Sequence, residues 1–112
     1  MSDKSAAYLL FSFTEPDNMQ GFGDYATAAD AIMDKFGGEL LVAGAKDAAI
    51  SKFEGQWPNG TGLTLIRFPS RQHLEDFWAS EDYQAIAHLR TNILTPNFTI
   101  GFSNAWRGDV AG

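Results

Sequence analysis

Arg90 is positioned so that its positive charge could bind an anionic ligand. On a helix, Tyr83, Ala87 and Arg90 fall on one flank, beside an apolar stripe that runs from Ile86 through Leu89 to Ile93. A guanidinium held beside a core could grip a carboxylate through two parallel hydrogen bonds. A structural reading stays open, in which Arg90 pairs with a carboxylate or a helix end while its stem packs on apolar surface.

Aromatic side chains could supply the walls of such a site. Tyr25, Trp78 and Tyr83 could line a cavity between helices and a sheet, where small ligands commonly bind. The same helical spacing is typical of an ordinary amphipathic core, so that reading also stays open. Trp57 lies in a turn and could cap the cavity mouth or pack its ring across a dimer. The predicted ligand-binding residues are therefore Tyr25, Trp57, Trp78, Tyr83 and Arg90, and no catalytic residue is assigned.

Other polar residues give weaker signals. Glu54 with Arg67 or Lys52 could form an acid/base pair, although charged residues on strands more often protect a sheet edge. His73 and His88 are the only imidazoles, and both are expected on the surface. Without a matching carboxylate spacing they do not form a metal site, and the chain has no cysteine to supply thiolates. No metal and no cofactor are expected.

Size and charge narrow the possible partners. A chain of 112 residues corresponds to one domain, here residues 1–112 with an ordered core at about 6–106. The net charge of −6 and the scattered basic residues argue against nucleic-acid binding. No apolar run approaches the roughly 20 residues that span a bilayer. The N-terminus lacks a signal-peptide layout, so we expect a cytoplasmic protein that does not associate with membranes.

Four strands are expected from the apolar runs in the chain. They are Ala7–Phe13, Glu39–Ala43, Gly62–Phe68 and Asn97–Ser103, with Ile50–Phe53 as a candidate continuation of the second strand after a bulge.

Two helical regions are expected between the strands. The spacing from Phe22 to Phe36 predicts an amphipathic helix that ends at Gly37-Gly38. Ser70 is a suitable N-cap for a second helix, and Ser80 is a second N-cap followed by acids, so this helix should break or restart there. Pro96 is expected to end it.

The order β-α-β-β-α-β predicts an α+β, ferredoxin-like sandwich: a four-stranded antiparallel sheet with two helices on one face. In the first strand Leu9 and Phe11 share one face, while Tyr8 and Leu10 share the other, so both faces of the sheet are apolar. The helices can cover only one of them. We expect a second copy to cover the other with two-fold symmetry, giving a barrel-like homodimer; a monomer with a partly wet apolar face is the alternative.

A set of short motifs occurs in a fixed order along this plan. It comprises Tyr8, Tyr25, Gly37-Gly38, Glu54-Gly55-Gln56-Trp57-Pro58, Arg67-Phe68-Pro69-Ser70, Ser80-Glu81-Asp82-Tyr83-Gln84 and Arg90. Over about Ala7 to Ser103 the chain resembles a small bacterial family catalogued as domain of unknown function thirteen-thirty, of the dimeric α/β-barrel superfamily.

The chain departs from that family pattern at a few positions. Glu81 stands where the family prefers Pro, Asp82 where it prefers Glu, and Phe77-Trp78 replaces a more usual Trp-Tyr pair. The resemblance implies the fold and the dimer, but the family has no agreed activity to carry over. Its superfamily includes cofactor-less monooxygenases, haem-degrading enzymes, lactone isomerases and stress-response dimers, and fold alone does not choose among them.

Three hypotheses for function follow. The first is a homodimer that binds a small organic molecule, anionic or aromatic, in a pocket between helices and sheet. The second is a cofactor-independent monooxygenase or isomerase acting on a small aromatic or lactone-like compound, because such chemistry needs only a shaped apolar pocket and a few polar groups. The third is a structural or stress-related dimer without a ligand. Whether the protein is an enzyme is left open.

Overall fold

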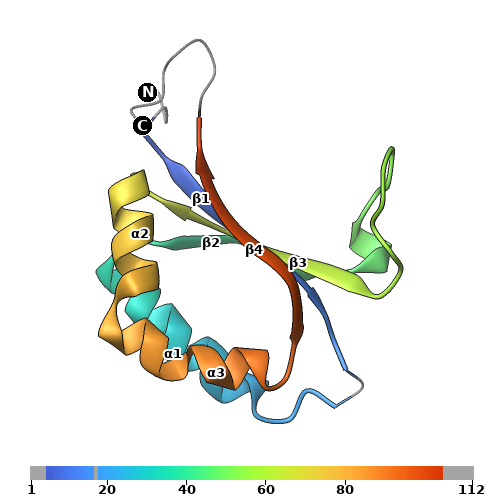
Figure 1. The fold of residues 1–112 in the computed structure, drawn as a ribbon, viewed down its shortest axis with the longest axis horizontal. Coiled ribbons are helices and arrows are strands. Elements are labelled where there is room, and N and C mark those ends of the chain that lie inside the picture. Colours follow the sequence, from blue (N-terminus) through green and yellow to red (C-terminus); the bar gives the residue numbers. More distant parts are fainter. Residues whose placement is uncertain (1–4, 17, 105–112) are drawn as a thin grey trace.

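The computed structural model describes residues 5–16 and 18–104. Figure 1 shows the chain as a sheet with all its α-helices on one side. The elements, in chain order, are β1 (Ala7–Thr14), α1 (Phe22–Lys35), β2 (Glu39–Ala45), the 3-10 turn η1 (Asp47–Ala49), β3 (Thr61–Phe68), α2 (Arg71–Ala79), α3 (Glu81–Thr91) and β4 (Thr95–Ser103).

The sheet has the order β2-β3-β1-β4, and every neighbouring pair is antiparallel. Strands β1 and β3 are central, so the α+β, ferredoxin-like plan is confirmed. The alternation predicted for β1 is also confirmed, because Leu9, Phe11 and Phe13 are buried on the side of the helices, whereas Tyr8 and Leu10 are only half-buried.

Helix α1 ends at the predicted glycine pair. Gly37 has φ of 76° and donates from its N–H to the Asp34 carbonyl, while the Gly38 N–H reaches the Met33 carbonyl at 2.9 Å. These two hydrogen bonds close the helix and satisfy two of its last carbonyls. A Cβ built on Gly37 would lie 2.8 Å from Cγ of Pro69, so both backbone and packing favour glycine there.

The predicted break at Ser80 is confirmed. The Ser80 hydroxyl accepts from the Tyr83 N–H at 3.1 Å, which caps α3, and donates to the Phe77 carbonyl at 2.7 Å, which closes α2. Glu81 and Asp82 occupy the first turn of α3, where the helix dipole favours acids. One serine therefore closes α2 and begins α3.

Two expected boundaries are wrong. Pro96 does not end the helix, since α3 stops at Thr91 and Pro96 lies inside β4 opposite Phe13. A proline is tolerated there because β4 is an edge strand. Residues Ile50–Phe53 form no strand; they belong to the loop after η1, and β2 instead extends to Ala45. The tail expected to fray from Arg107 lies outside the described residues.

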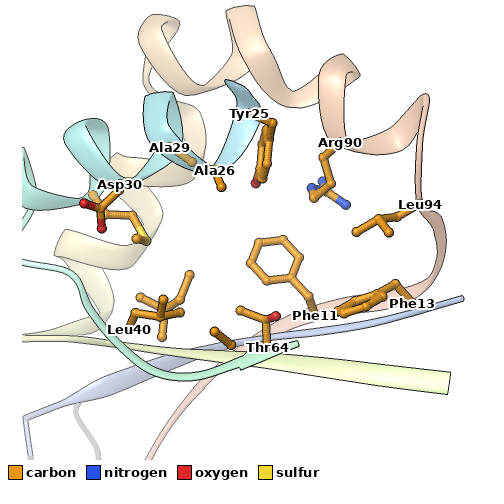
Figure 2. A pocket seen from close by; sticks show the side chains of 13 residues that line it. Phe11, Phe13, Tyr25, Ala26, Ala29, Asp30, Leu40, Thr64, Arg90 and Leu94 are labelled. Carbon is orange, nitrogen blue, oxygen red and sulfur yellow. The ribbon is translucent and has the colours of Figure 1, made fainter. Parts of the chain in front are cut away.

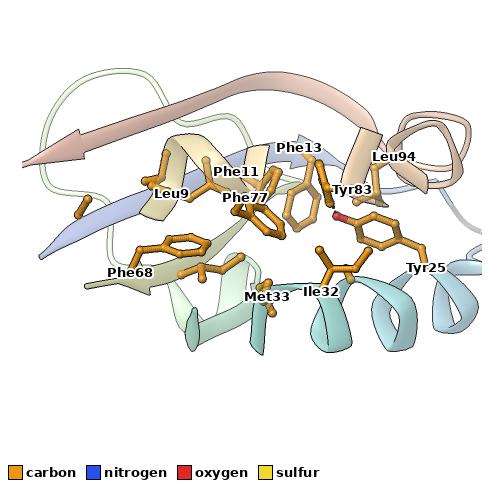
Figure 3. Close-up of a cluster of buried hydrophobic side chains, with 14 residues drawn as sticks. Leu9, Phe11, Phe13, Tyr25, Ile32, Met33, Phe68, Phe77, Tyr83 and Leu94 are labelled. Atoms are coloured by element: carbon orange, nitrogen blue, oxygen red, sulfur yellow. Dashed lines mark hydrogen bonds between the residues drawn. The ribbon is translucent and has the colours of Figure 1, made fainter. Parts of the chain in front are cut away.

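The core lies between the three α-helices and the central strands (Figure 3). Phe68, Phe77 and Tyr83 are fully buried, and the Phe77 ring lies 5.2 Å from that of Phe68 and 4.6 Å from that of Tyr83. The Trp78 ring also contacts Tyr83, with the two ring centroids 5.3 Å apart and the planes tilted by 41°. This packing holds Tyr83 in one position.

Among the described residues, none of the helices has the length and apolar character needed to cross a bilayer. The single-domain organisation and the cytoplasmic location stay predictions.

Replacing Ser80 with alanine should lower the free energy of unfolding by about 1 kcal/mol, because the cap of α3 is lost. Urea denaturation measures the change. Ser51→Ala is the matched control: Ser51 is exposed in a loop, so its replacement should change stability by less than about 0.5 kcal/mol. Equal effects of the two substitutions would contradict the role given to Ser80.

Candidate functional site

A cavity of about 110 Å³ lies between α1 and the sheet (Figure 2). Helix α1 contributes Tyr25, Ala29 and Met33 to its wall, and the central strands contribute Phe11 and Ile66. These side chains are buried and, apart from the tyrosine hydroxyl, apolar. The cavity therefore suits a ligand with an apolar body.

The mouth of the cavity lies between α1 and the edge strand β2. Four of its lining residues are exposed, namely Ala26 and Asp30 of α1 and Leu40 and Ala43 of β2. Arg90 lines the cavity as well, but is buried. A ligand would therefore enter between α1 and β2 and reach Arg90 at the inner end.

Arg90 is held between aromatic rings. The residue is only 7% exposed. Its Cζ lies 4.8 Å from the ring centroid of Phe11 and 6.0 Å from that of Trp78, and its Nε donates to the Tyr83 hydroxyl at 3.2 Å. The position in the last turn of α3 adds a favourable interaction with the helix dipole. The guanidinium is thus fixed without an anion.

Within residues 5–16 and 18–104, no carboxylate lies within 4.0 Å of the Arg90 guanidinium. In that same part of the chain, only the Nε–H of its N–H donors makes a hydrogen bond of ordinary geometry. A guanidinium carries five donors, and buried charges are normally paired. The structural ion pair considered above is therefore not found there, and the site has capacity to bind an anion.

Tyr83 and Tyr25 continue the hydrogen-bonded chain from the Arg90 guanidinium to the cavity. The hydroxyls of Tyr25 and Tyr83 are 2.8 Å apart (Figure 3). Since the Tyr83 oxygen already accepts from Arg90, its own hydrogen is available for Tyr25. In that arrangement the Tyr25 hydrogen is free to be donated into the cavity, which Tyr25 lines and Tyr83 does not.

The Tyr25 hydroxyl is a donor rather than a base. Burial raises the pKa of Tyr25 far above its usual value, and the neighbouring Tyr83 raises it further, whereas the Arg90 guanidinium opposes the shift. The group consequently stays protonated at neutral pH and can donate a hydrogen bond to an anion.

Of the five predicted ligand-binding residues, Tyr25, Trp78, Tyr83 and Arg90 lie together. Only Tyr25 and Arg90 line the cavity, whereas Trp78 and Tyr83 contact Arg90 without lining it. Trp57 is not with them. Its ring lies 6.3 Å from that of Phe98 and its Nε1 donates to the Thr61 carbonyl at 3.2 Å. Phe98 is opposite Ser12, which alternates with the cavity-side Phe11, so Trp57 lies on the face of the sheet away from the helices.

The stripe predicted beside Arg90 is only partly right. Ile86 and Leu89 are half-buried, and Ile93 follows the end of α3, whereas Tyr83 and Arg90 are the buried residues of that helix. Because α3 packs against α1, the face of α3 that carries Tyr83 and Arg90 is turned toward the core. Sequence reasoning also missed Asp30, because nothing in the pattern shows which edge of the sandwich opens.

The weaker polar candidates are dispersed. Arg67 lies 3.7 Å from Glu39 and Lys52 lies 3.8 Å from Asp47, so neither forms the suggested ion pair with Glu54. His73 and His88 are exposed, as expected. In the part of the chain that the structure covers, no three His, Cys, Asp or Glu side chains gather as metal ligands.

Fold and sequence together define the family. The chain belongs to the family described as Domain of unknown function (DUF1330), whose sequence profile matches residues 6–100. The predicted resemblance is thereby confirmed. No curated protein matches the chain.

Solved structures share the fold at low sequence identity. A protein of unknown function from Rhodopseudomonas palustris, RPA0582, is 13% identical with a TM-score of 0.65, and the match covers 90% of this chain and 83% of that one. SnoaB, a cofactor-independent oxygenase from Streptomyces nogalater, is 9% identical with a TM-score of 0.58, covering 89% and 93%. At such identities the likeness shows the fold alone.

The buried tyrosine gives a pH dependence. Because the pKa of Tyr25 is raised in the native state, stability is fully present below the unfolded pKa of about 10 and is lost as pH rises above it. Urea denaturation between about pH 8 and about pH 11 should show a steeper loss for the wild type than for Tyr25→Phe. An equally steep loss in Tyr25→Phe would contradict this assignment.

Proposed function

We propose that the protein binds a small organic anion, with the anionic group on Arg90 and the apolar body in the cavity. The observation that carries this proposal is the buried guanidinium, which has donors to spare and no carboxylate beside it in the described residues. The Nη groups of Arg90 and the Tyr25 hydroxyl, both in the lining of the cavity, would donate to the anion.

Preorganisation supports the same conclusion. Phe11, Trp78 and Tyr83 hold the guanidinium before any ligand arrives, so little side-chain entropy is lost on binding. A planar carboxylate matches the fork of an arginine.

The cavity volume of about 110 Å³ is somewhat less than the roughly 150 Å³ of a cavity that holds benzene. A small ring or a short chain, extending toward the mouth, is the expected body.

Benzoate should raise the melting temperature of the protein in a concentration-dependent way, whereas benzyl alcohol, which lacks the charge, should raise it much less. Arg90→Gln should weaken benzoate binding at least about tenfold, since a charge-assisted bidentate contact is lost. Arg71→Gln is the matched control, because Arg71 is exposed on α2 and pairs with Glu75; it should leave binding unchanged.

Tyr25→Phe provides a second variant in case Arg90→Gln fails to fold. It removes one donor and should weaken benzoate binding about threefold to tenfold, while benzyl alcohol is unaffected. A benzoate effect that survives in both variants, or equal effects of benzoate and benzyl alcohol in the wild type, would contradict the proposal.

We also propose that a second copy covers the other face of the sheet. Phe98, Ile100 and Phe102 of β4 are 41%, 47% and 41% exposed there, and Phe53 in the adjoining loop is 89% exposed. Together with Tyr8 and Leu10 they form an apolar patch of the kind that marks an interaction site. Such a patch, which adjoins the Arg67–Glu39 ion pair on the same face, can pack on its own copy by two-fold symmetry.

Sedimentation at micromolar concentration should report a dimer. Ile100→Ser should shift the protein to monomer, because a polar group would enter the apolar interface. Leu40→Ser is the matched control, since Leu40 has the same 47% exposure but lies on the helix side of the sheet; this variant should stay dimeric. A monomeric wild type would overturn the dimer and leave the anion site standing.

A cofactor-independent oxygenase or isomerase is the second candidate. The line from Arg90 through Tyr83 to Tyr25 could stabilise an enolate or phenolate oxygen as charge develops. Oxygen uptake with a hydroxylated aromatic acid, lost in Tyr25→Phe although the acid still binds, would select the oxygenase. Chemical conversion of the acid without oxygen uptake would select the isomerase. Binding without turnover leaves the first proposal, and no binding of any acid favours a structural dimer.

A further inference from the structure

We infer that the ligand of this cavity is zwitterionic, with a carboxylate at Arg90 and a cationic amine at Asp30. The inference rests on the proposed anion site and adds the chemistry of the other end of the ligand. Two side chains of opposite charge line the same cavity. Figure 2 shows Asp30 and Arg90 at opposite ends of the lining, with apolar side chains between them.

Asp30 is free to bind a ligand at the mouth. Over the described residues it makes neither an ion pair nor a hydrogen bond, whereas Asp47 and Asp82 are each paired with a lysine. It lines the cavity and is exposed. A carboxylate at the entrance of a site built for an anion would repel a simple anion, so it is useful only if the ligand carries a positive group there.

The rise of α1 between the two ends gives the approximate scale of the ligand. Tyr25 marks the Arg90 end, because its hydroxyl bonds Tyr83, which in turn accepts from Arg90. Asp30 is five residues further along α1, which corresponds to about 7.5 Å of helix rise. An ω-amino acid or an aminomethyl-substituted benzoate has its two charges at a similar separation.

The middle of the cavity is mostly apolar. Phe11 lies between the two ends (Figure 2), and Phe11, Met33 and Ile66 are buried residues of the lining. Thr64 adds a hydroxyl whose oxygen already accepts from the Gly44 N–H, so a strongly polar centre of the ligand would find few partners there. The ligand class is therefore a small molecule with an apolar spacer and opposite charges at its ends.

Calorimetric titration with para-(aminomethyl)benzoate and para-methylbenzoate tests this directly, because the two probes differ only by the amine. The wild type should bind the aminomethyl compound about twofold to fivefold more tightly at low salt, a modest preference since Asp30 is exposed. The preference should shrink as ionic strength rises.

Asp30→Asn should reduce the ratio of the two affinities to about one. Asp34→Asn is the matched control: it removes the same charge from the same helix, at an exposed position that does not line the cavity, and it should keep the preference. Equal binding of the two probes by the wild type, or a preference unchanged in Asp30→Asn, overturns the zwitterion inference while the anion site stands. Binding of neither probe overturns both.

Discussion

The structure depends on a positive charge buried among aromatic rings. Arg90 is fixed by a ring from β1, a ring from α2 and a hydroxyl from α3, and Tyr25 joins this group from α1. No single element could hold the guanidinium in place. The ferredoxin-like order brings these four elements together at one end of the sandwich, so the fold itself accounts for the site.

The two faces of the sheet have different roles. The helix side carries the core and the cavity, and its aromatic packing around Phe77 and Tyr83 keeps the hydroxyl of Tyr83 at hydrogen-bonding distance from Arg90. The other side carries Phe98, Ile100 and Phe102, which its own chain leaves partly exposed. One short chain thus presents an internal cavity and an apolar surface on opposite faces of its sheet.

Local chemistry made much of the fold predictable, whereas positions set by tertiary packing were not. Gly37 and Ser80 act through bonds to near neighbours, so the end of α1 and the break between α2 and α3 follow from sequence. The prediction that Pro96 ends the helix was wrong, because edge strands tolerate proline. Tyr25, Trp78, Tyr83 and Arg90 lie together, but only Tyr25 and Arg90 line the cavity, because spacing within one helix does not show how three helices pack against one another. The place of Trp57 could not be predicted, because a residue in a loop carries no periodicity that assigns it to a face.

The central claim is that the Arg90 guanidinium receives a carboxylate. Nitrogen-detected NMR of the arginine side chains, with and without benzoate, observes that contact itself. The account predicts that the Nη resonances of Arg90, assigned by their loss in Arg90→Lys, shift and exchange more slowly as benzoate is added, while those of the exposed Arg71 stay unchanged. Unaltered Arg90 resonances at benzoate concentrations that raise the melting temperature would contradict it.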